Sequence, residues 1–453
     1  MCCINTHIKD IWVLETIVST HLKLKAALLG SVLSLSVAGS VQAEGLSEAL
    51  STLLVEHERI KAAQADLDAA RANMGVAEGG YFPTLSLTAN TGHETIYTRN
   101  PVTDAATQTA LPQREIDLGV SQTLWDFGAT KATVGGANLA IAQAEVALVL
   151  AKQTLLLDAL SAQLNLASAA RVLDYQTQSE TSIKHQTELE NARVRRGSGF
   201  STDVLQAKTQ LAGAQAARVR ASGTLRQSVN RYRALFHTVP ENFSTLELPA
   251  IQDNLIPEDE STIVEVALKN NPQVRTSSIL AEIANTEIDR SFASGYRPVI
   301  AASADQKYKR DVGGTIGHKT ETLVKLELTY SFNMGLTASS TLEASKSGHA
   351  AANSRLKDAR DQIEEQARNA WQNLQTARDN AEFLNNQANI SAEFLELARK
   401  ERTLGQRSLI DVLAGETSLI NAQSAADRAM TDVAIAKLTV LSVMGQLDPS
   451  VLQ

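Results

Sequence analysis

The sequence contains an internal duplication in which each copy places a short glycine turn between two long segments without helix breakers. Gly197 is followed after five residues by Asp203-Val-Leu, and Gly405 is followed at the same spacing by Asp411-Val-Leu. One offset of 208 residues relates the two copies. A repeat of this length constrains the architecture more strongly than any local motif does. We therefore expect one elongated body made of two equivalent halves.

Proline is absent from 113–239 and from 299–448. Because an interior proline costs a helix about 3 kcal/mol, such stretches permit very long helices. Apolar residues along them keep a single seam, while the other faces carry Ala, Gln, Ser, Asn and charged residues, so the pattern predicts coiled-coil packing and not lipid-spanning helices. At 1.5 Å per residue, the first helix would be on the order of 100 Å long. The predicted long helices are 132–196 and 202–236 in the first half and 337–404 and 408–446 in the second.

A pair of alternating segments precedes the long helices in each half. After Pro83, for example, Leu85 and Leu87 alternate with Ser86 and Thr88, which is typical of a strand with one apolar face. Polar loops at roughly 99–114 and 310–320 connect the two members of each pair. The predicted strands are 84–98 and 114–127 in the first half and 298–309 and 321–332 in the second. The predicted organisation is a leader at 1–43, a first repeat at 44–250 and a second repeat at 251–453, each repeat beginning with a helix.

Aromatic residues gather around these strands. Ten of the 19 in the chain fall within 81–127 and 292–332. Aromatic residues at the ends of strands with an apolar outer face are typical of transmembrane β-barrels, although an amphipathic sheet on a soluble core fits the strands alone equally well. The candidate aromatic girdle consists of Tyr81, Phe82, Trp125, Phe127, Tyr296, Tyr330 and Phe332.

The N-terminal region has the pattern of a secretory signal peptide. Lys23 and Lys25 precede an apolar stretch at 26–41, and a Val-Gln-Ala sequence predicts cleavage after Ala43. The apolar stretch is short for the alternative, a membrane anchor. We expect translation to begin near Leu22. Both cysteines of the chain lie before the cleavage point, so the mature protein is expected to have neither a disulfide nor a lipidated cysteine.

The composition gives no sign of an enzyme or of a nucleic-acid-binding protein. The formal charge is −8, and no basic residues are clustered. The eight histidines are scattered, and no zinc motif or glycine-rich phosphate loop is present. We therefore predict no catalytic, cofactor or metal site.

The order strand, loop, strand, long helix, Gly-x5-Asp-Val-Leu turn and returning helix, present twice, resembles the TolC-like family of outer-membrane export channels over essentially the whole mature chain. The resemblance implies a mainly α-helical fold with a membrane β-barrel: a coiled-coil α-barrel crossing the periplasm, and four strands per chain that form a 12-stranded barrel in a homotrimer. Independently, four strands are too few to close a barrel, because about eight are needed. The implied partners are two further copies, outer-membrane lipid, a periplasmic adaptor protein and an inner-membrane ABC or RND transporter.

The resemblance also implies roles for the glycine turns. Arg402 stands where the family usually has tyrosine, and Ala414 where it usually has a second acidic residue. We expect an Arg402–Asp203 ion pair to replace the tyrosine contact. Alternatively, the glycines only cap helix ends, and the aspartates only stabilise the next helices through the helix dipole. The implied gate residues are Thr202, Asp203, Arg402, Arg407 and Asp411, and the implied adaptor contacts are Gly197, Ser198, Gly199, Leu404, Gly405 and Gln406.

The predicted function is that of a passive exit duct, opened at the periplasmic turns and energised by an inner-membrane transporter. The absence of a lipidated cysteine favours one-step protein secretion or a general-purpose channel over a lipid-anchored drug-efflux member. The main alternative is a periplasmic or surface coiled-coil scaffold without a pore, although a scaffold has no need for the strands. An adaptor protein is a weaker alternative, because adaptors have one helical hairpin and this chain has two.

Overall fold

The computed structural model describes residues 46–198, 200–240, 243, 246, 251–332 and 334–452. The predicted signal peptide, its cleavage point and both cysteines lie outside these residues. The first repeat contains α2 (Leu46–Glu56), α3 (Glu58–Glu78), η1 (Gly79–Tyr81), β1 (Thr84–Arg99), β2 (Ala106–Trp125), α4 (Ala129–Arg195) and α5 (Ser201–Phe236). The remaining elements are η3 (Asp253–Leu255), α6 (Glu260–Asn270), α7 (Pro272–Tyr296), β3 (Val299–Arg310), β4 (His318–Thr329), α8 (Thr337–Thr403), α9 (Leu409–Val443) and η4 (Pro449–Leu452).

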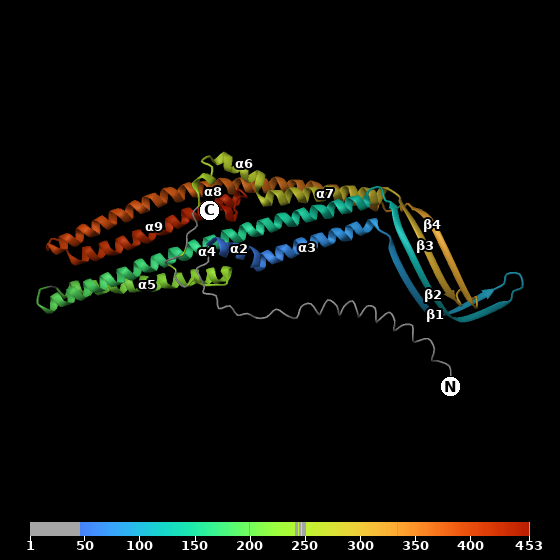
Figure 1. The fold of residues 1–453 in the computed structure, drawn as a ribbon, viewed down its shortest axis with the longest axis horizontal. Helices are drawn as coiled ribbons and strands as arrows, with labels where there is room; N and C mark the ends of the chain where they lie inside the picture. The colour runs from blue at the N-terminus through green and yellow to red at the C-terminus, as the bar shows by residue number, and fades with distance from the viewer. Residues whose placement is uncertain are drawn as a thin grey trace, which may run out of the picture. The chain divides into compact units, whose positions relative to one another are not determined.

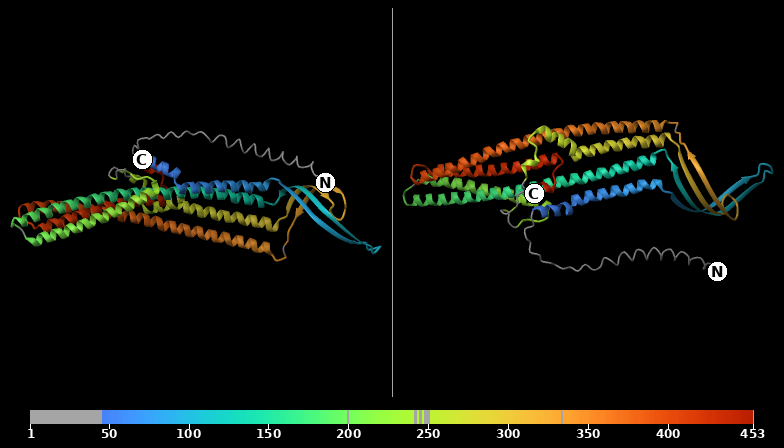
Figure 2. Two further views of the ribbon diagram at one scale, coloured as in Figure 1. Left: turned by 90° about the horizontal axis from the view of Figure 1, so that it is seen from below. Right: turned by 45° about the horizontal axis from the view of Figure 1, so that its top comes forward.

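The helices form two matching sets, α3–α4–α5 and α7–α8–α9, joined at one end to the sheet (Figure 1). The long helices α4 and α8 have 67 residues each. Near the sheet they lie beside α3 and α7, and in the other half they lie beside α5 and α9 (Figure 2). Each long helix therefore runs from the sheet to a hairpin turn at the opposite end, in agreement with the predicted duplication.

The main core lies where the shorter helices cross the two long ones. Leu155 and Leu160 of α4, Ile263 of α6, Leu374 of α8 and Leu438 of α9 are fully buried there. The hairpins beyond this core are held by smaller clusters in which alanine is prominent. Small side chains along a helix seam let neighbouring backbones approach closely, which explains how long helices can associate with so little bulky apolar packing.

One glycine is required by a close approach at the end of α9. Gly445 has φ +69°, and a Cβ at this position would lie 2.6 Å from the carbonyl oxygen of Asn270. The side chain of Asn271 donates to the carbonyl oxygen of Val443 at 2.9 Å. These contacts fix the end of α9 against the junction of α6 and α7, at the level of the main core.

The four strands form one antiparallel sheet in the order β1-β2-β3-β4. The second strand begins at Ala106 and not at the predicted residue 114, and the expected loop over 99–114 is therefore wrong. Pro112 falls within the expected loop, but in the structure it pairs with His93 of β1 within the ladder. Because β3 ends opposite Arg114, this part of β2 has a single neighbouring strand. Proline is tolerated in a strand where one side is free of ladder hydrogen bonds.

The sheet has two chemically distinct faces. The register places Leu87 opposite Leu118 and Ala304 opposite Val324 on one side, which we call the apolar face. The other side, the polar face, carries ion pairs. Two join neighbouring strands, Lys307 to Asp117 at 2.9 Å and Lys309 to Glu321 at 2.8 Å, and a third joins Lys325 to Glu327 within β4 at 2.7 Å. On this polar face, the carboxylate of Glu94 in β1 also accepts hydrogen bonds from the backbone N–H groups of Gly313 and Gly314 in the β3–β4 turn.

One of the described helices, α4, contains an 18-residue stretch that is apolar enough to cross a membrane when judged by length and composition alone.

Candidate functional site

Two turns of similar geometry, which we call the hairpin tips (196–200 and 404–408), connect the long helices to their returning partners. Gly197 has φ +76° and Gly405 has φ +77°. In the first tip, Ser198 N–H donates to the carbonyl oxygen of Arg193 at 3.0 Å, and in the second, Gln406 N–H donates to that of Glu401 at 2.9 Å. This is the Schellman arrangement, in which a left-handed glycine ends a helix. The predicted glycine caps are therefore present at both tips.

The returning helices begin differently at the two tips. The hydroxyl oxygen of Ser408 accepts from the N–H of Asp411 at 3.2 Å, which is a side-chain N-cap. Phe200, at the corresponding position before α5, has no capping side chain. Leu404 and Phe200 are both exposed, so each tip presents an apolar side chain to the surroundings. Gly199, predicted to contact an adaptor, lies outside the described residues.

An ion pair across the two hairpins involves a residue that the sequence did not indicate. A guanidinium nitrogen of Arg402 in α8 lies 2.9 Å from the carboxylate of Glu190 in α4. Glu190 is only 4% exposed, and its carboxylate also lies 3.4 Å from a guanidinium nitrogen of Arg193. Arg402 donates in addition to the backbone carbonyl oxygen of Arg407 at 3.2 Å. Within the described chain, Arg402 therefore binds Glu190 and makes no hydrogen bond or ion pair with Asp203, contrary to the expected replacement contact.

The position of Glu190 explains this difference. Ile183, Thr187 and Glu190 follow the four- and three-residue spacing of a buried helix seam, and all three are buried. The seam faces α5 and α9, and at its end the carboxylate of Glu190 meets Arg402 from the last turn of α8. Thr202 is exposed and Asp203 is half-buried in the first turn of α5. An acidic residue at a seam position was the signal that could have identified Glu190.

Arg407 binds within its own hairpin. Its guanidinium lies 2.5 Å from the carboxylate of Glu401 and over the ring of Phe394, 5.3 Å from the ring centroid. A cation over an aromatic face contributes about 0.5–1 kcal/mol at an exposed site. Asp411 and Ala414 are both exposed on the adjacent turn of α9. Of the predicted gate residues, only Arg402 therefore joins the two hairpins of one chain.

A second buried carboxylate forms an ion pair close to the Arg402–Glu190 contact. Glu416 of α9 is buried and forms a close ion pair with Arg399 of α8. A cleft of about 270 Å3 lies beside this network, with Glu190, Arg399 and Arg402 on its walls. The tip region therefore combines buried acids, arginines that reach them from α8, and a cleft between the two hairpins.

The seven predicted girdle residues all lie at the end of the sheet that joins the helices, and all are exposed. Trp125 and Phe127 pack edge to face with centroids 6.1 Å apart. Arg297 lies 5.9 Å from the centroid of Phe127 and 5.4 Å from that of Phe292. Above this aromatic end, the apolar face exposes large aliphatic side chains: Leu85, Leu87, Ile116, Leu118, Val120, Val324, Leu326 and Leu328. An aromatic end followed by an exposed apolar band is the arrangement of a sheet that contacts lipid.

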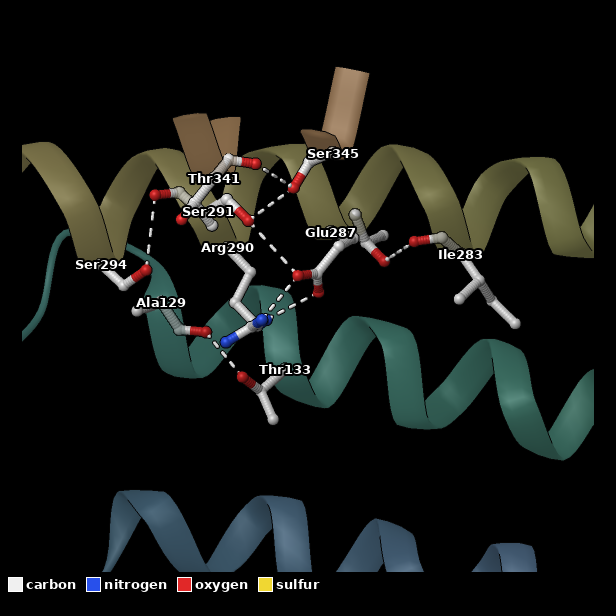
Figure 3. Close-up of polar contacts among 10 residues, drawn as sticks. Ala129, Thr133, Ile283, Glu287, Arg290, Ser291, Ser294, Thr341 and Ser345 are labelled. Atoms are coloured by element: carbon white, nitrogen blue, oxygen red, sulfur yellow. Dashed lines mark hydrogen bonds and ion pairs between the residues drawn. The ribbon is translucent and has the colours of Figure 1, made fainter. Parts of the chain in front are cut away.

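Polar contacts lie within α7 and between α7 and α8, close to the sheet (Figure 3). Arg290 donates to both carboxylate oxygens of Glu287, at 2.7 and 2.5 Å. The hydroxyl oxygens of Ser291, which is buried, and Ser345 of α8 are 2.8 Å apart. The hydrogen bonds from Arg290 hold the pKa of Glu287 below its usual range.

We expect Glu287→Gln to lower the melting temperature at pH 7 and to have a smaller effect at pH 3. A carboxylate with a lowered pKa stabilises the fold above its unfolded pKa of about 4.3, and this contribution is lost as the pH falls through the folded value. Because the pair is partly exposed, the effect is modest, about 1 kcal/mol or less. Thermal unfolding in detergent at both pH values measures it, with Glu282→Gln on an exposed part of α7 as control. The same loss at pH 3 would contradict the assignment.

The part of the chain that the structure describes contains no group of three or more His, Cys, Asp or Glu side chains arranged to hold a metal ion.

Comparison with known proteins gives a consistent result. A family model described as outer membrane efflux protein matches residues 49–236. The chain is 22% identical over 409 residues to the outer membrane efflux protein BepC of Brucella suis biovar 1, covering 89% of this chain and 86% of BepC. It is 24% identical over 441 residues to the outer membrane protein TolC of Escherichia coli K12, covering 94% of this chain and 87% of TolC.

The fold is also found among solved structures. The CmeC outer membrane channel of Campylobacter jejuni superposes with a TM-score of 0.75 at 15% identity, over 90% of this chain and 88% of CmeC. The duplicated helices, the four-stranded sheet with its exposed apolar face, and these similarities lead to one assignment. The chain has the fold of the TolC-like outer-membrane efflux channels and is similar to them over nearly its whole length, in keeping with a place in the outer membrane.

Proposed function

We propose that the protein acts as a homotrimer whose 12 strands close a barrel in the outer membrane and whose helices continue as a tunnel into the periplasm. The observation that carries this proposal is the open, two-faced sheet. β1 and β4 are its outer strands, and its apolar face is exposed in the single chain. Four strands are too few to close a barrel, whereas three chains joined edge to edge give an even-numbered barrel without free edges.

In this proposal the duct is passive and carries no catalytic activity of its own. Energy comes from an inner-membrane ABC or RND transporter, which is linked to the hairpin tips by a periplasmic adaptor protein. The exposed Leu404 and Phe200 at the two tips support such a contact. The name of BepC, an outer membrane efflux protein, supports export through the outer membrane, and the cargo is either a secreted protein or small molecules.

The periplasmic entrance is proposed to be closed by the charges at the tips. Arg402 and Glu190 join the two hairpins of one chain. Thr202, Asp203 and Asp411 make no ion pair within the described chain, and we propose that they contact a neighbouring subunit in the closed trimer. In this proposal the glycine caps and the charged side chains act together. The caps shape the turns, and the charged side chains hold neighbouring hairpins in contact.

The purified protein is expected to run as a heat-modifiable trimer and to conduct ions across a planar lipid bilayer. Conductance follows from the polar, ion-paired inner face of the barrel. The same preparation, heated until the trimer dissociates, provides the control. A trimer that never conducts would support the coiled-coil scaffold instead, and a monomer that does not enter lipid would exclude both the barrel and the tunnel.

The two kinds of cargo can be separated in cells. Removing the protein and restoring it allows two measurements on the same strains: the set of proteins released into the medium and the accumulation of fluorescent dyes. Loss of a released protein alone indicates one-step protein secretion, and increased dye retention alone indicates small-molecule efflux. Cross-linking from the hairpin tips then identifies the adaptor.

A further inference from the structure

A row of basic side chains crosses three strands on the apolar face. Arg114 of β2 pairs directly with Arg310 of β3, and Arg310 pairs directly with His318 of β4. Residues directly opposite on neighbouring strands point to the same face. Ile116, two residues after Arg114, is an exposed member of the apolar band. The row Arg114–Arg310–His318, which we call the basic row, therefore lies on the lipid-facing side of the sheet.

The basic row is incompletely neutralised by the protein. Like charges placed directly opposite on neighbouring strands destabilise a sheet, so the Arg114–Arg310 pair calls for an anion. Arg310 forms an ion pair with Asp311, in which its Nε lies 3.5 Å from a carboxylate oxygen. Arg114 has no ion pair within the described residues. The adjacent Glu115 belongs to the polar face, where it faces Lys309 at 3.7 Å.

The basic row also marks one edge of the apolar band. Arg114 precedes Trp125, a girdle residue, by 11 positions on β2. At about 3.3 Å per residue and a strand tilt of 35–45°, this separation corresponds to roughly 25–30 Å along the membrane normal, close to the height of a barrel's apolar band. The seven girdle residues thus lie at one edge of the band, and the basic row lies at the other, away from the helices.

We propose that the basic row binds the phosphate groups of a phosphorylated glycolipid in the outer leaflet, whose acyl chains cover the apolar face below it. The inference rests on the proposed barrel, since it places this edge at the outer surface. Arginine binds phosphate through paired hydrogen bonds. Because the basic row spans two strand spacings, about 10 Å in all, a headgroup with more than one phosphate fits better than a single-phosphate phospholipid. The exposed Tyr308, in the adjacent row, lies beside the headgroup at the top of the band.

The test compares the purified full-length trimer with the double variant Arg114→Gln/Arg310→Gln. The probes are phosphorylated lipid A, the same lipid after enzymatic dephosphorylation, and phosphatidylglycerol, each in detergent micelles. Native mass spectrometry measures the bound fraction. We expect the wild-type trimer to prefer phosphorylated lipid A to both other lipids, and the double variant to bind it roughly tenfold more weakly or worse, because two charge-assisted contacts are lost.

Two further variants make the result specific. Arg114→Lys/Arg310→Lys keeps the charge but loses the paired hydrogen bonds, so it should bind with intermediate affinity. Lys319→Gln removes an exposed charge next to His318 on the polar face and should bind as wild type does. Equal binding by the wild type and the Gln double variant would overturn the inference, and equal binding of phosphatidylglycerol would overturn the choice of glycolipid.

Conductance and trimer formation are measured on the same samples. The arginine variants should conduct as wild type does, since neither changes the polar lining or the hairpin tips. Lys319→Gln removes one charge from the polar face, so it serves as a control for lipid binding only. Failure of lipid binding with intact conductance rejects only the basic row. Failure of the wild type to form a conducting trimer rejects the proposed channel itself.

Discussion

Leu87→Arg in β1 is expected to abolish assembly of the trimer in membranes, whereas Thr88→Arg at the next position is expected to leave it intact. Leu87 is 71% exposed in the single chain and lies on the apolar face, near the middle of the band. Arginine at the lipid-facing middle of a barrel costs about 2–4 kcal/mol, and a homotrimer contains three copies of the substitution.

Thr88 provides a matched control because successive residues of a strand point to opposite faces. It pairs with Asp117 on the polar face, where one carboxylate oxygen of Asp117 has no hydrogen-bond partner. The measurement is the fraction of heat-modifiable trimer after folding into phosphatidylcholine vesicles. If both variants fold to the same extent, the apolar face does not contact lipid.

Arg402→Ala is expected to open the periplasmic end and to raise single-channel conductance in planar bilayers. Removing one partner of a buried ion pair costs about 3–5 kcal/mol, because the remaining charge is left in a dry environment. Arg193 also contacts Glu190, so we expect the lower end of this range. The loss weakens the contact between the two hairpins, which is where the entrance is proposed to be closed.

Two variants test the cause of this effect. Lys400→Ala removes a charge two residues away whose pair with Glu396 is 65% and 68% exposed, so it should change little. Adding Glu190→Gln to Arg402→Ala should recover the stability of the fold, since no buried charge remains at this contact. The single-channel conductance should stay raised, because the Arg402–Glu190 ion pair is still absent. Unchanged conductance in Arg402→Ala would show that the Arg402–Glu190 pair does not hold the entrance closed.

The helical part of the fold could be predicted from sequence because its determinants are local. Long stretches without proline permit helices, and the repeated glycines mark their ends. The strands β1 and β3 begin at Thr84 and Val299, each directly after a proline. Proline restricts the residue before it and ends a helix, so these boundaries are also set by neighbouring residues.

The start of β2 and the partner of Arg402 depend on contacts between distant segments. Pro112 looks like a loop residue until the register shows that β3 has already ended beside it. Arg402 and Glu190 are 212 positions apart, and the packing of α4 and α8 against α9 brings them together. Periodicity identified the seam, but it could not show which helix a buried acid on that seam would face.

The membrane-facing surface was predicted in part. The aromatic residues could be recognised from composition and position, and the structure brings all seven to one edge of the band. The opposite edge is formed by Arg114, Arg310 and His318, which lie far apart in the sequence. Their alignment depends on the register of two strand pairs, which sequence alone does not provide.

The first strand pair is much longer than the second. Beyond Arg114, β1 and β2 continue as a ribbon of two strands that ends in the turn at 100–105, whereas β3 has already finished. This ribbon makes no ladder with the rest of the sheet. In the proposed barrel its turn extends beyond the wall on the outer surface, so its sequence can vary without altering the strand pairing that closes the wall.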